Sequence, residues 1–252
     1  MQHICMHSPA VREHALQLVR SGLNDCEVAR RTGISRTTIR DWRRPRYRPR
    51  GPVRSPCPRC WSPSLHMSFE PEDYAELLGL YLGDGHVVQL ARTCRFRLFL
   101  DSRHTEIVLQ SRALLRRCFP HHAVGTVLGH EGRMTVLSVH SSHMCCVFPQ
   151  HGPGMKHTRA IRLEAWQKTL VGRAPWHLLK GLIRSDGCSF MNRTGPYEYL
   201  SYGFSNHSTD IIDLFCETCD ALGLEYRRYA RAVRINRRSS VARLEAKIGV
   251  KR

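Results

Sequence analysis

Two segments of this chain follow the same pattern, and each contains an aspartate. They are residues 77–85, LLGLYLGDG, and residues 179–187, LKGLIRSDG. Both follow Leu-x-Gly-Leu-x-x-small-Asp-Gly, and the aspartates Asp84 and Asp186 are 102 residues apart. A repeat at this spacing indicates one structural unit used twice. The repeat therefore predicts two acidic side chains in equivalent positions of two related units.

Small residues within the repeats predict a close pair of helices. Gly79 and Gly83 are four residues apart, as are Gly181 and Ser185. Residues at this spacing share one helix face, and small side chains there let two helices approach closely. We expect the two helices to pair about a pseudo-twofold axis, with the aspartates side by side at their C-terminal ends. The simpler alternative is that each Asp-Gly only forms a turn, but that does not explain the shared pattern.

The charge of the chain indicates a polyanionic partner. Its 252 residues carry a formal net charge of +18, and 34 of its 39 basic residues are arginine. Such an excess is typical of proteins that bind DNA or RNA, and the arginine fork can bind phosphate or guanine through two hydrogen bonds. A GC-rich genome can favour arginine over lysine, but it does not account for the net charge. The length allows one large domain and a small one.

Residues 9–44 have the pattern of a small helical domain. Pro9 suits the first turn of a helix whose apolar face contains Val11, Ala15, Leu18 and Val19. Asn24 and Asp25 can cap a short second helix over residues 26–31, Gly33 provides a turn, and Ser35 caps a third helix that ends near Arg44.

The stretch 23–42 resembles the helix-turn-helix family found in transposases and bacterial regulators. The resemblance implies that the third helix contacts bases in the DNA major groove. A plain three-helix bundle is the alternative. The candidate DNA-binding residues of this helix are Ser35, Arg36, Thr37, Thr38 and Arg40.

Residues 45–69 have the composition of a basic linker rich in proline and arginine. Arg48, Arg50 and Arg54 could lie near the minor groove as an extended arm, or the segment could simply be solvated. Cys57 and Cys60 have the spacing of a zinc knuckle. A second pair is not nearby, since Cys216 and Cys219 fall in a predicted amphipathic helix, so a zinc ion is the weaker interpretation and two free thiols the stronger one. His66 is a further candidate zinc ligand.

The rest of the chain has the same predicted element order twice. Each unit is predicted to be helix, two strands, helix, two strands, helix. For the first unit we expect helices at 71–82, 104–118 and 160–169 and strands at 86–92, 94–101, 123–129 and 133–140. For the second we expect helices at 175–184, 208–222 and 239–247 and strands at 188–192, 197–205 and within 225–237.

With both motifs and this order of elements, residues 70–252 resemble the LAGLIDADG homing endonucleases in their single-chain form with two motifs. The resemblance implies an α+β fold of two pseudo-twofold related αββαββα units, at 70–170 and 171–252, after the helix-turn-helix domain at 9–44. It implies that the sheets form a saddle on DNA, which brings Arg95 and Arg97 of one strand to the list of candidate DNA-binding residues.

The same resemblance implies a magnesium-dependent endonuclease that makes a staggered double-strand break. Asp84 and Asp186 would be catalytic and would bind Mg²⁺ together with the backbone carbonyls of Gly83 and Ser185. Carboxylates that hold divalent metals provide what phosphodiester hydrolysis needs. Further polar residues near the phosphates are expected, and the candidates are Gln89, Arg97, Lys156 and Asn206.

Two other functions remain open from the sequence. A transcriptional regulator could keep the fold without cleaving DNA, and an RNA-binding splicing helper is a weaker possibility. The paired aspartates favour cleavage. We expect a monomer that binds double-stranded DNA without a small-molecule cofactor. The sequence has no recognisable leader or membrane span, and its eleven cysteines are scattered, so we expect a cytoplasmic, nucleoid-associated protein.

Overall fold

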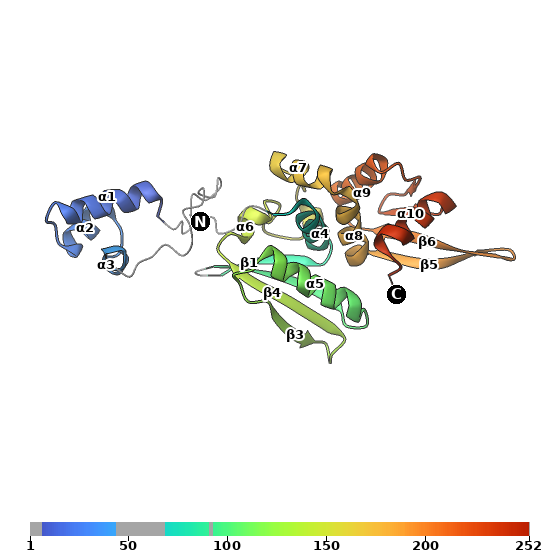
Figure 1. Cartoon of the computed structure of the whole chain (residues 1–252), viewed down its shortest axis with the longest axis horizontal. Helices are drawn as coiled ribbons and strands as arrows, with labels where there is room; N and C mark the ends of the chain where they lie inside the picture. Colours follow the sequence, from blue (N-terminus) through green and yellow to red (C-terminus); the bar gives the residue numbers. More distant parts are fainter. Residues whose placement is uncertain (1–6, 44–68, 91–92, 252) are drawn as a thin grey trace. The chain divides into compact units, whose positions relative to one another are not determined.

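A computed structural model describes residues 7–43, 69–90 and 93–251 of the chain (Figure 1). The chain divides into two compact units, Met1–Met67 and Ser68–Arg252. None of the helices in the described ranges is long and apolar enough to cross a lipid bilayer.

The described part of the N-terminal unit consists of three helices. They are α1 (Pro9–Arg20), α2 (Asp25–Thr32) and α3 (Arg36–Arg43). Asn24 and Glu27 form a capping box that starts α2, and Gly33, with a φ of 70°, ends this helix. At the start of α3, the Ser35 hydroxyl accepts a hydrogen bond from the Thr38 backbone amide. The predicted caps of α2 and α3 are therefore confirmed.

The core of this unit explains why the helices stay together. Ala15, Val28, Ile34 and Ile39 are buried, and Leu18, Val19, Leu23, Ala29 and Trp42 pack against them. The prediction that Val11 faces this core is wrong, because Val11 is 40% exposed and the buried core begins one turn later, at Ala15.

The second unit contains two halves with the same order of elements, as predicted. The bounds in the first half are α4 (Pro71–Leu82), β1 (Gly85–Gln89), β2 (Cys94–Asp101), α5 (Thr105–Cys118), β3 (Gly125–Gly129), β4 (Met134–Ser141), α6 (Met144–Val147), η1 (Lys156–Thr158) and α7 (Ala165–Arg173). The bounds in the second half are α8 (Pro175–Asp186), β5 (Gly187–Thr194), β6 (Tyr197–Ser205), α9 (Thr209–Ala221), β7 (Arg227–Arg228), β8 (Ala232–Ile235) and α10 (Arg238–Ile248).

Each half forms a four-stranded antiparallel sheet of the same topology. The strand orders are β1-β2-β4-β3 and β5-β6-β8-β7. Along β2 buried and half-buried residues alternate, so Phe96, Leu98 and Leu100 face the core while Arg95 and Arg97 lie on the other face. In the second sheet Tyr202, Phe204, Val233 and Ile235 are buried. Each sheet therefore has one face covered by helices and one open face.

The two halves meet at α4 and α8, which lie side by side between the sheets (Figure 1). Both helices begin with a proline in the first turn, which fits the preference of helix N-termini for proline. Almost all of α4 is buried, from Tyr74 through Leu82. A helix that is apolar on nearly all sides needs neighbours on all sides, and α4 has them in α5, α7 and α8.

The structure differs from the sequence prediction mainly after β4. The helix expected at 160–169 is instead α7 (Ala165–Arg173). The short helix α6 and the 3₁₀ turn η1 were not expected. The conformation of this region depends on hydrogen bonds to residues distant in the sequence. Its own sequence therefore shows no hydrophobic periodicity from which the elements could be predicted.

Candidate functional site

Glycines allow the backbones of α4 and α8 to touch. A Cβ atom on Gly79 would lie 2.6 Å from the Leu178 carbonyl oxygen, and one on Gly181 would lie 2.3 Å from the Glu76 carbonyl oxygen. A Cβ on Gly83 would collide with the Ser185 side chain, whose hydroxyl donates to the Gly181 carbonyl at 3.0 Å. The four predicted small residues thus lie where the helices are closest.

The glycine after each aspartate lets the strand that follows pack directly against the helix that precedes it. A Cβ on Gly85 would lie 2.5 Å from the Tyr81 Cα, and one on Gly187 would lie 2.6 Å from the Ile183 Cα. The chain therefore leaves the helix, passes the aspartate and enters the first strand of the sheet with no intervening loop. This geometry holds both aspartates at the junction between the helix pair and the two sheets.

The carboxylates of Asp84 and Asp186 affect each other. Burial and, to a smaller extent, the negative charge of Asp186 raise the pKa of Asp84 to about 6, although Lys251 and Lys156 act in the opposite direction. The pKa of Asp186 is raised as well, by burial, while a hydrogen bond from Asn206 acts in the opposite direction. A raised carboxyl pKa indicates negative charge that its surroundings do not fully neutralise.

One lysine lies at each aspartate. The Lys156 ammonium donates to the Gly83 carbonyl oxygen at 2.7 Å, and the Lys251 ammonium donates to the Ser185 carbonyl oxygen at 2.7 Å. Burial lowers the pKa of Lys156 to about 8 and also lowers the pKa of Lys251, although both aspartates oppose these shifts. The two lysines therefore occupy equivalent places, each at the residue before an aspartate.

A buried hydrogen-bond network holds the segment that carries Lys156. The Gln150 amide donates to the Arg162 carbonyl at 2.8 Å and to Gln167 at 2.6 Å, and Gln167 donates to the Tyr74 hydroxyl of α4 at 2.6 Å. Arg159 donates to the Gln150 carbonyl at 2.9 Å. The loop between Phe148 and Lys156 is therefore fixed to α4 at both ends, and it delivers the lysine to the site.

The two aspartates differ in their side-chain partners. Asn206 donates to the Asp186 carboxylate at 2.6 Å, and its own carbonyl accepts the Ser208 amide at 2.7 Å. At the corresponding strand-to-helix corner of the first half the residue is Ser102, whose hydroxyl pairs with Thr135 at 2.8 Å. The strand pairing places Ser102 two residues farther from its aspartate than Asn206. Within the described residues, Asp84 receives no such side-chain hydrogen bond.

An ion cluster of unequal composition lies across the helix pair. Glu76 of α4 is 6% exposed and accepts hydrogen bonds from Lys180 at 2.8 Å and from Arg184 at 2.9 Å, both on α8. The positions on α4 that correspond to the two cations are Leu78 and Leu82, and the position on α8 that corresponds to Glu76 is Leu178. This cluster was not predicted from the sequence.

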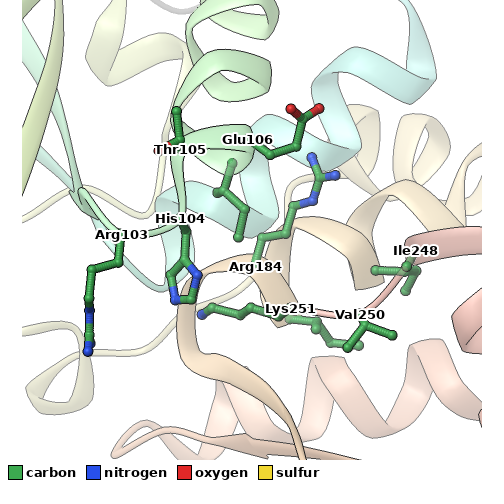
Figure 2. Close-up of a pocket in the computed structure, with 11 residues that line it drawn as sticks. Arg103, His104, Thr105, Glu106, Arg184, Ile248, Val250 and Lys251 are labelled. Atoms are coloured by element: carbon green, nitrogen blue, oxygen red, sulfur yellow. The ribbon is translucent and has the colours of Figure 1, made fainter.

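A pocket of about 300 Å³ lies next to Lys251 (Figure 2). It is bounded by the start of α5, the end of α8 and the segment 248–251. The side chains of His104 and Lys251 point toward each other in it, and Arg103 and Arg184 add positive charge to its lining (Figure 2). The pocket therefore combines a basic lining with direct access to one lysine of the site.

The remaining predicted residues lie in several places. Arg95 and Arg97 lie on the open face of the first sheet, where Arg95 donates to Ser138 at 3.3 Å and Arg97 contacts His86 at 3.3 Å. Gln89 ends β1 at the edge of that sheet. Of the candidates on α3, Arg36, Thr37 and Arg40 are exposed and Thr38 is partly buried, and Ser35 just before the helix is exposed too. Arg48, Arg50, Arg54, Cys57, Cys60 and His66 lie outside the described residues.

The donors at the aspartate pair fit a hard divalent cation. Mg²⁺ prefers oxygen ligands, and two carboxylates and the Gly83 and Ser185 carbonyls meet here. Each carbonyl accepts a lysine hydrogen bond but has a second lone pair, and the raised pKa of Asp84 indicates charge that a cation would relieve. Across 7–43, 69–90 and 93–251, no three His, Cys, Asp or Glu residues are grouped to hold a metal, so the carbonyls would be needed.

Sequence reasoning named Lys156 only as one candidate among four and missed Lys251. Two signals could have found both. The segments Gly154-Met155-Lys156 and Gly249-Val250-Lys251 repeat a Gly-x-Lys pattern, and both glycines have positive φ values of 76° and 81°. The chain also has only five lysines, and Lys156, Lys180 and Lys251 all lie at the helix pair. In a chain dominated by arginine, each lysine is informative because its compact charge differs from the arginine fork.

Comparisons with known proteins bear on the fold of both units. A family model described as a homeodomain-like domain matches residues 6–51. No curated protein sequence matches the chain. Among solved structures, full-length WhiA from Thermatoga maritima is 14% identical with a TM-score of 0.48, and the match covers 75% of this chain and 59% of WhiA. This chain thus spans well under two thirds of that protein.

Two structures of the homing endonuclease I-DmoI are more similar in shape. Its mesophilic variants match with 14% identity and a TM-score of 0.50, covering 71% of this chain and 96% of theirs. I-DmoI in complex with DNA and Mn matches with 15% identity and a TM-score of 0.50, covering 72% of this chain and 98% of that one. Together with the two sheets and the central helix pair, these matches show that the chain has the LAGLIDADG fold, preceded by a homeodomain-like helix-turn-helix domain.

Proposed function

We propose that this protein binds double-stranded DNA and cleaves it at a specific site by phosphodiester hydrolysis. The observation that carries the proposal is the central cluster, in which two aspartates and two lysines lie at equivalent ends of a helix pair. A solved neighbour of the same fold, I-DmoI, is in complex with DNA and Mn.

The N-terminal domain would recognise bases. In helix-turn-helix domains the last helix enters the major groove, and α3 has Ser35, Arg36, Thr37 and Arg40 exposed. Replacing both Arg36 and Arg40 by alanine should weaken binding. It should also reduce the slope of the logarithm of the binding constant against the logarithm of salt concentration, by about one for each phosphate that an arginine no longer neutralises. An unchanged footprint and salt slope would exclude these two residues from the interface.

The open faces of the two sheets would contact the rest of the site. Arg95 and Arg97 lie on the first face, and Arg227 and Arg234 pair as neighbours on the second. The β5–β6 hairpin has eight paired positions, whereas the β1–β2 hairpin has five. The next strand, β8, pairs only with Tyr202–Ser205 of β6, so the rest of the hairpin extends beyond the sheet. The second half therefore extends a longer hairpin (Figure 1), and we expect it to contact the longer half of the DNA site.

Each aspartate would act on one DNA strand. Asp84 and Asp186, with the Gly83 and Ser185 carbonyls, would hold Mg²⁺, which supplies charge neutralisation at the phosphate and an acidified water. Lys156 and Lys251 would bind the phosphate oxygens as point charges near the carboxylates. Because the pKa of Lys156 is about 8, its ammonium remains mostly protonated at neutral pH and can stabilise the charge that develops there. Cys57 and Cys60 could hold a structural zinc ion in the linker.

A specific observation favours a second candidate, a regulator that binds DNA without cleaving it. The lysines supply two positive charges to the two aspartates, and they occupy the carbonyls that a metal would share. The two lysines therefore offset part of the carboxylate charge without a metal. In such a regulator the helix pair would be a scaffold, and the helix-turn-helix domain and sheets would provide the function.

Purified protein on a randomised duplex library, with Mg²⁺ in one reaction and Ca²⁺ in the other, separates the two candidates. An endonuclease will cut a defined site in Mg²⁺. The Asp84→Asn Asp186→Asn double variant will then bind the same site without cutting. Specific binding with intact DNA in both metals would establish the regulator, and loss of binding in the double variant would exclude the assigned role of the aspartates.

The same proposal assigns domains and assembly. The domains would be residues 9–44, 70–170 and 171–252, joined by the linker 45–69. Because one chain supplies both helices and both aspartates, the active form would be a monomer. Sedimentation of the protein bound to its DNA site should give one chain per duplex. A two-chain complex would contradict this assignment.

A further inference from the structure

Two cysteine thiols of the first half lie against each other, outside the site described above. Cys94 begins β2 and is 3% exposed, and Cys145 lies on the short helix α6 and is partly buried. Their sulfur atoms are 3.3 Å apart. Both are reduced thiols in this structure. We propose that Cys94 and Cys145 form an oxidative modification site, at which a peroxide converts the two thiols into a reversible disulfide.

The geometry provides the required contact. A disulfide has a sulfur–sulfur distance of about 2.05 Å, so the two Sγ atoms, 3.3 Å apart, must approach by about 1.25 Å. Backbone anchoring holds both partners nearby. Cys94 pairs with Ser141 of β4, four residues before Cys145, and Phe148 just after α6 stacks on Tyr81 at 4.2 Å.

The two thiols differ in solvent exposure, and this difference indicates which of them reacts with peroxide first. Oxidation starts at the more accessible thiol, which here is Cys145. Its thiolate attacks one peroxide oxygen, the oxygen–oxygen bond breaks, and sulfenic acid forms at Cys145 with release of water. The Cys94 thiol then attacks that sulfur and expels a second water. Overall, two thiols and one peroxide give one disulfide and two waters, so peroxide is reduced and both sulfurs are oxidised.

The third partner of this pair is Gln89. Its side-chain carbonyl oxygen lies 2.9 Å from the Cys94 sulfur and 3.8 Å from the Cys145 sulfur, and both can donate to it as thiols. A disulfide has no S–H group, so oxidation removes both donors from the Gln89 carbonyl. The bond would therefore tie β2 to α6 and leave the Gln89 side chain with its donated hydrogen bond to the Leu90 carbonyl at 3.1 Å.

The test uses the full-length chain, fully reduced and then treated with hydrogen peroxide. Remaining thiols are alkylated, and the protein is digested with trypsin without reduction. Cys94 lies between Arg92 and Arg95, while the tryptic segment 134–156 contains both Cys145 and Cys146. The expected product is a cross-link between these two peptides that disappears after treatment with a dithiol.

The neighbouring Cys146 supplies the matched control. It is 5% exposed on the same helix, and replacing it leaves Cys145 as the only cysteine of its peptide. Cys146→Ser should keep the cross-link, and Cys145→Ser should abolish it and leave Cys94 reduced. In Cys94→Ser, which should keep the circular dichroism of the parent, sulfenic acid should accumulate at Cys145 and be trapped by dimedone.

Two results would overturn the proposal. One is a cross-link from Cys145 to Cys146 or to any cysteine other than Cys94. The other is oxidation of Cys145 to sulfinic acid in the parent protein with no cross-link, since a thiol 3.3 Å away should react with the sulfenic acid first. The mapping on the parent protein decides the matter even if a variant fails to fold.

Discussion

The two halves of the second unit have the same backbone plan but different side chains around their aspartates. In both, a glycine follows the aspartate and a lysine donates to the carbonyl before it. Among the residues that the structure describes, only the second half adds an amide, Asn206, on the carboxylate. Both halves therefore place an aspartate and a lysine in the same positions. They differ in the side-chain hydrogen bonds that shift the pKa of each aspartate.

The largest effect is expected where the halves are most alike. Gly181→Ala would place a Cβ 2.3 Å from the Glu76 carbonyl oxygen, and Gly79→Ala would place one 2.6 Å from the Leu178 carbonyl oxygen. Because backbone atoms cannot rotate away, the helices must separate, and we expect a loss of about 4 kcal/mol in the free energy of unfolding. Denaturant titration measures it. Gly172→Ala on α7, where a Cβ meets nothing within 4 Å, is the control and should cost nothing.

A smaller loss should follow from removal of Glu76. Glu76→Ala leaves Lys180 and Arg184 without their carboxylate in a largely buried interface, at a cost of about 3 kcal/mol. Replacing all three residues by leucine copies the residues found at the corresponding positions of the opposite helices. That triple variant should recover most of the stability, because a buried ion cluster and an apolar interface are often similar in free energy. A triple variant as unstable as Glu76→Ala would show that the cluster itself is indispensable.

Removing a negative charge from the site should stabilise the fold. The pKa of Asp84 is raised from 3.8 to about 6, so the folded protein binds a proton before the unfolded chain as the pH falls. The carboxylate therefore costs stability above pH 6, and that cost disappears below about pH 4. Asp84→Asn should gain about 2 kcal/mol at pH 8 and nothing at pH 3.

The partner substitution tests the comparison directly. Asp186→Asn should gain less than Asp84→Asn, since Asn206 would lose its carboxylate acceptor. Unfolding curves of both variants at pH 3 and pH 8 provide the measurement. Equal gains would mean that the amide does not distinguish the two aspartates.

The smallest effect concerns Asn206 itself. Asn206→Ser copies Ser102, the residue at the corresponding corner of the first half, and should cost about 1 kcal/mol. Without the amide, the pKa of Asp186 should rise, which a carboxyl-carbon NMR titration can follow. The reciprocal Ser102→Asn should leave the pKa of Asp84 at about 6, because Ser102 lies four residues beyond Leu98, the partner of Gly85, whereas Asn206 lies two residues beyond Phe204, the partner of Gly187. An unchanged pKa of Asp186 in Asn206→Ser would show that Asn206 is not the source of the difference.

The sequence predicted the fold well because its signals are local and doubled. The Leu-x-Gly-Leu pattern, the apolar period of α5 and the alternation in β2 each specify an element, and the second copy confirms their order. Prediction failed where structure depends on long-range contacts. The segment after β4 is held by Gln150, Gln167 and Tyr74, which are far apart in sequence and have no shared period.

The site was predicted in part for the same reason. The aspartates lie within the repeated pattern, so their proximity followed from the pairing of two helices. The lysines are brought in by segments far along the chain, Lys156 by a loop and Lys251 by residues after α10, and each is recognised only once its backbone carbonyl partner is known. Glu76 was missed because an acidic residue on an otherwise apolar helix gives no indication of which residues oppose it.

The unequal ion cluster across α4 and α8 also limits how this protein can assemble. If two copies of the first half were paired, each Glu76 would face leucines and would be buried without a cation. If two copies of the second half were paired, Lys180 and Arg184 would face Leu178 and would lack an anion. Pairing of two identical halves therefore buries charges without partners, whereas pairing of the first half with the second does not. We therefore expect each half to pair with the other half and not with a copy of itself. Two fragments cut between α7 and α8 should recombine with each other in preference to themselves.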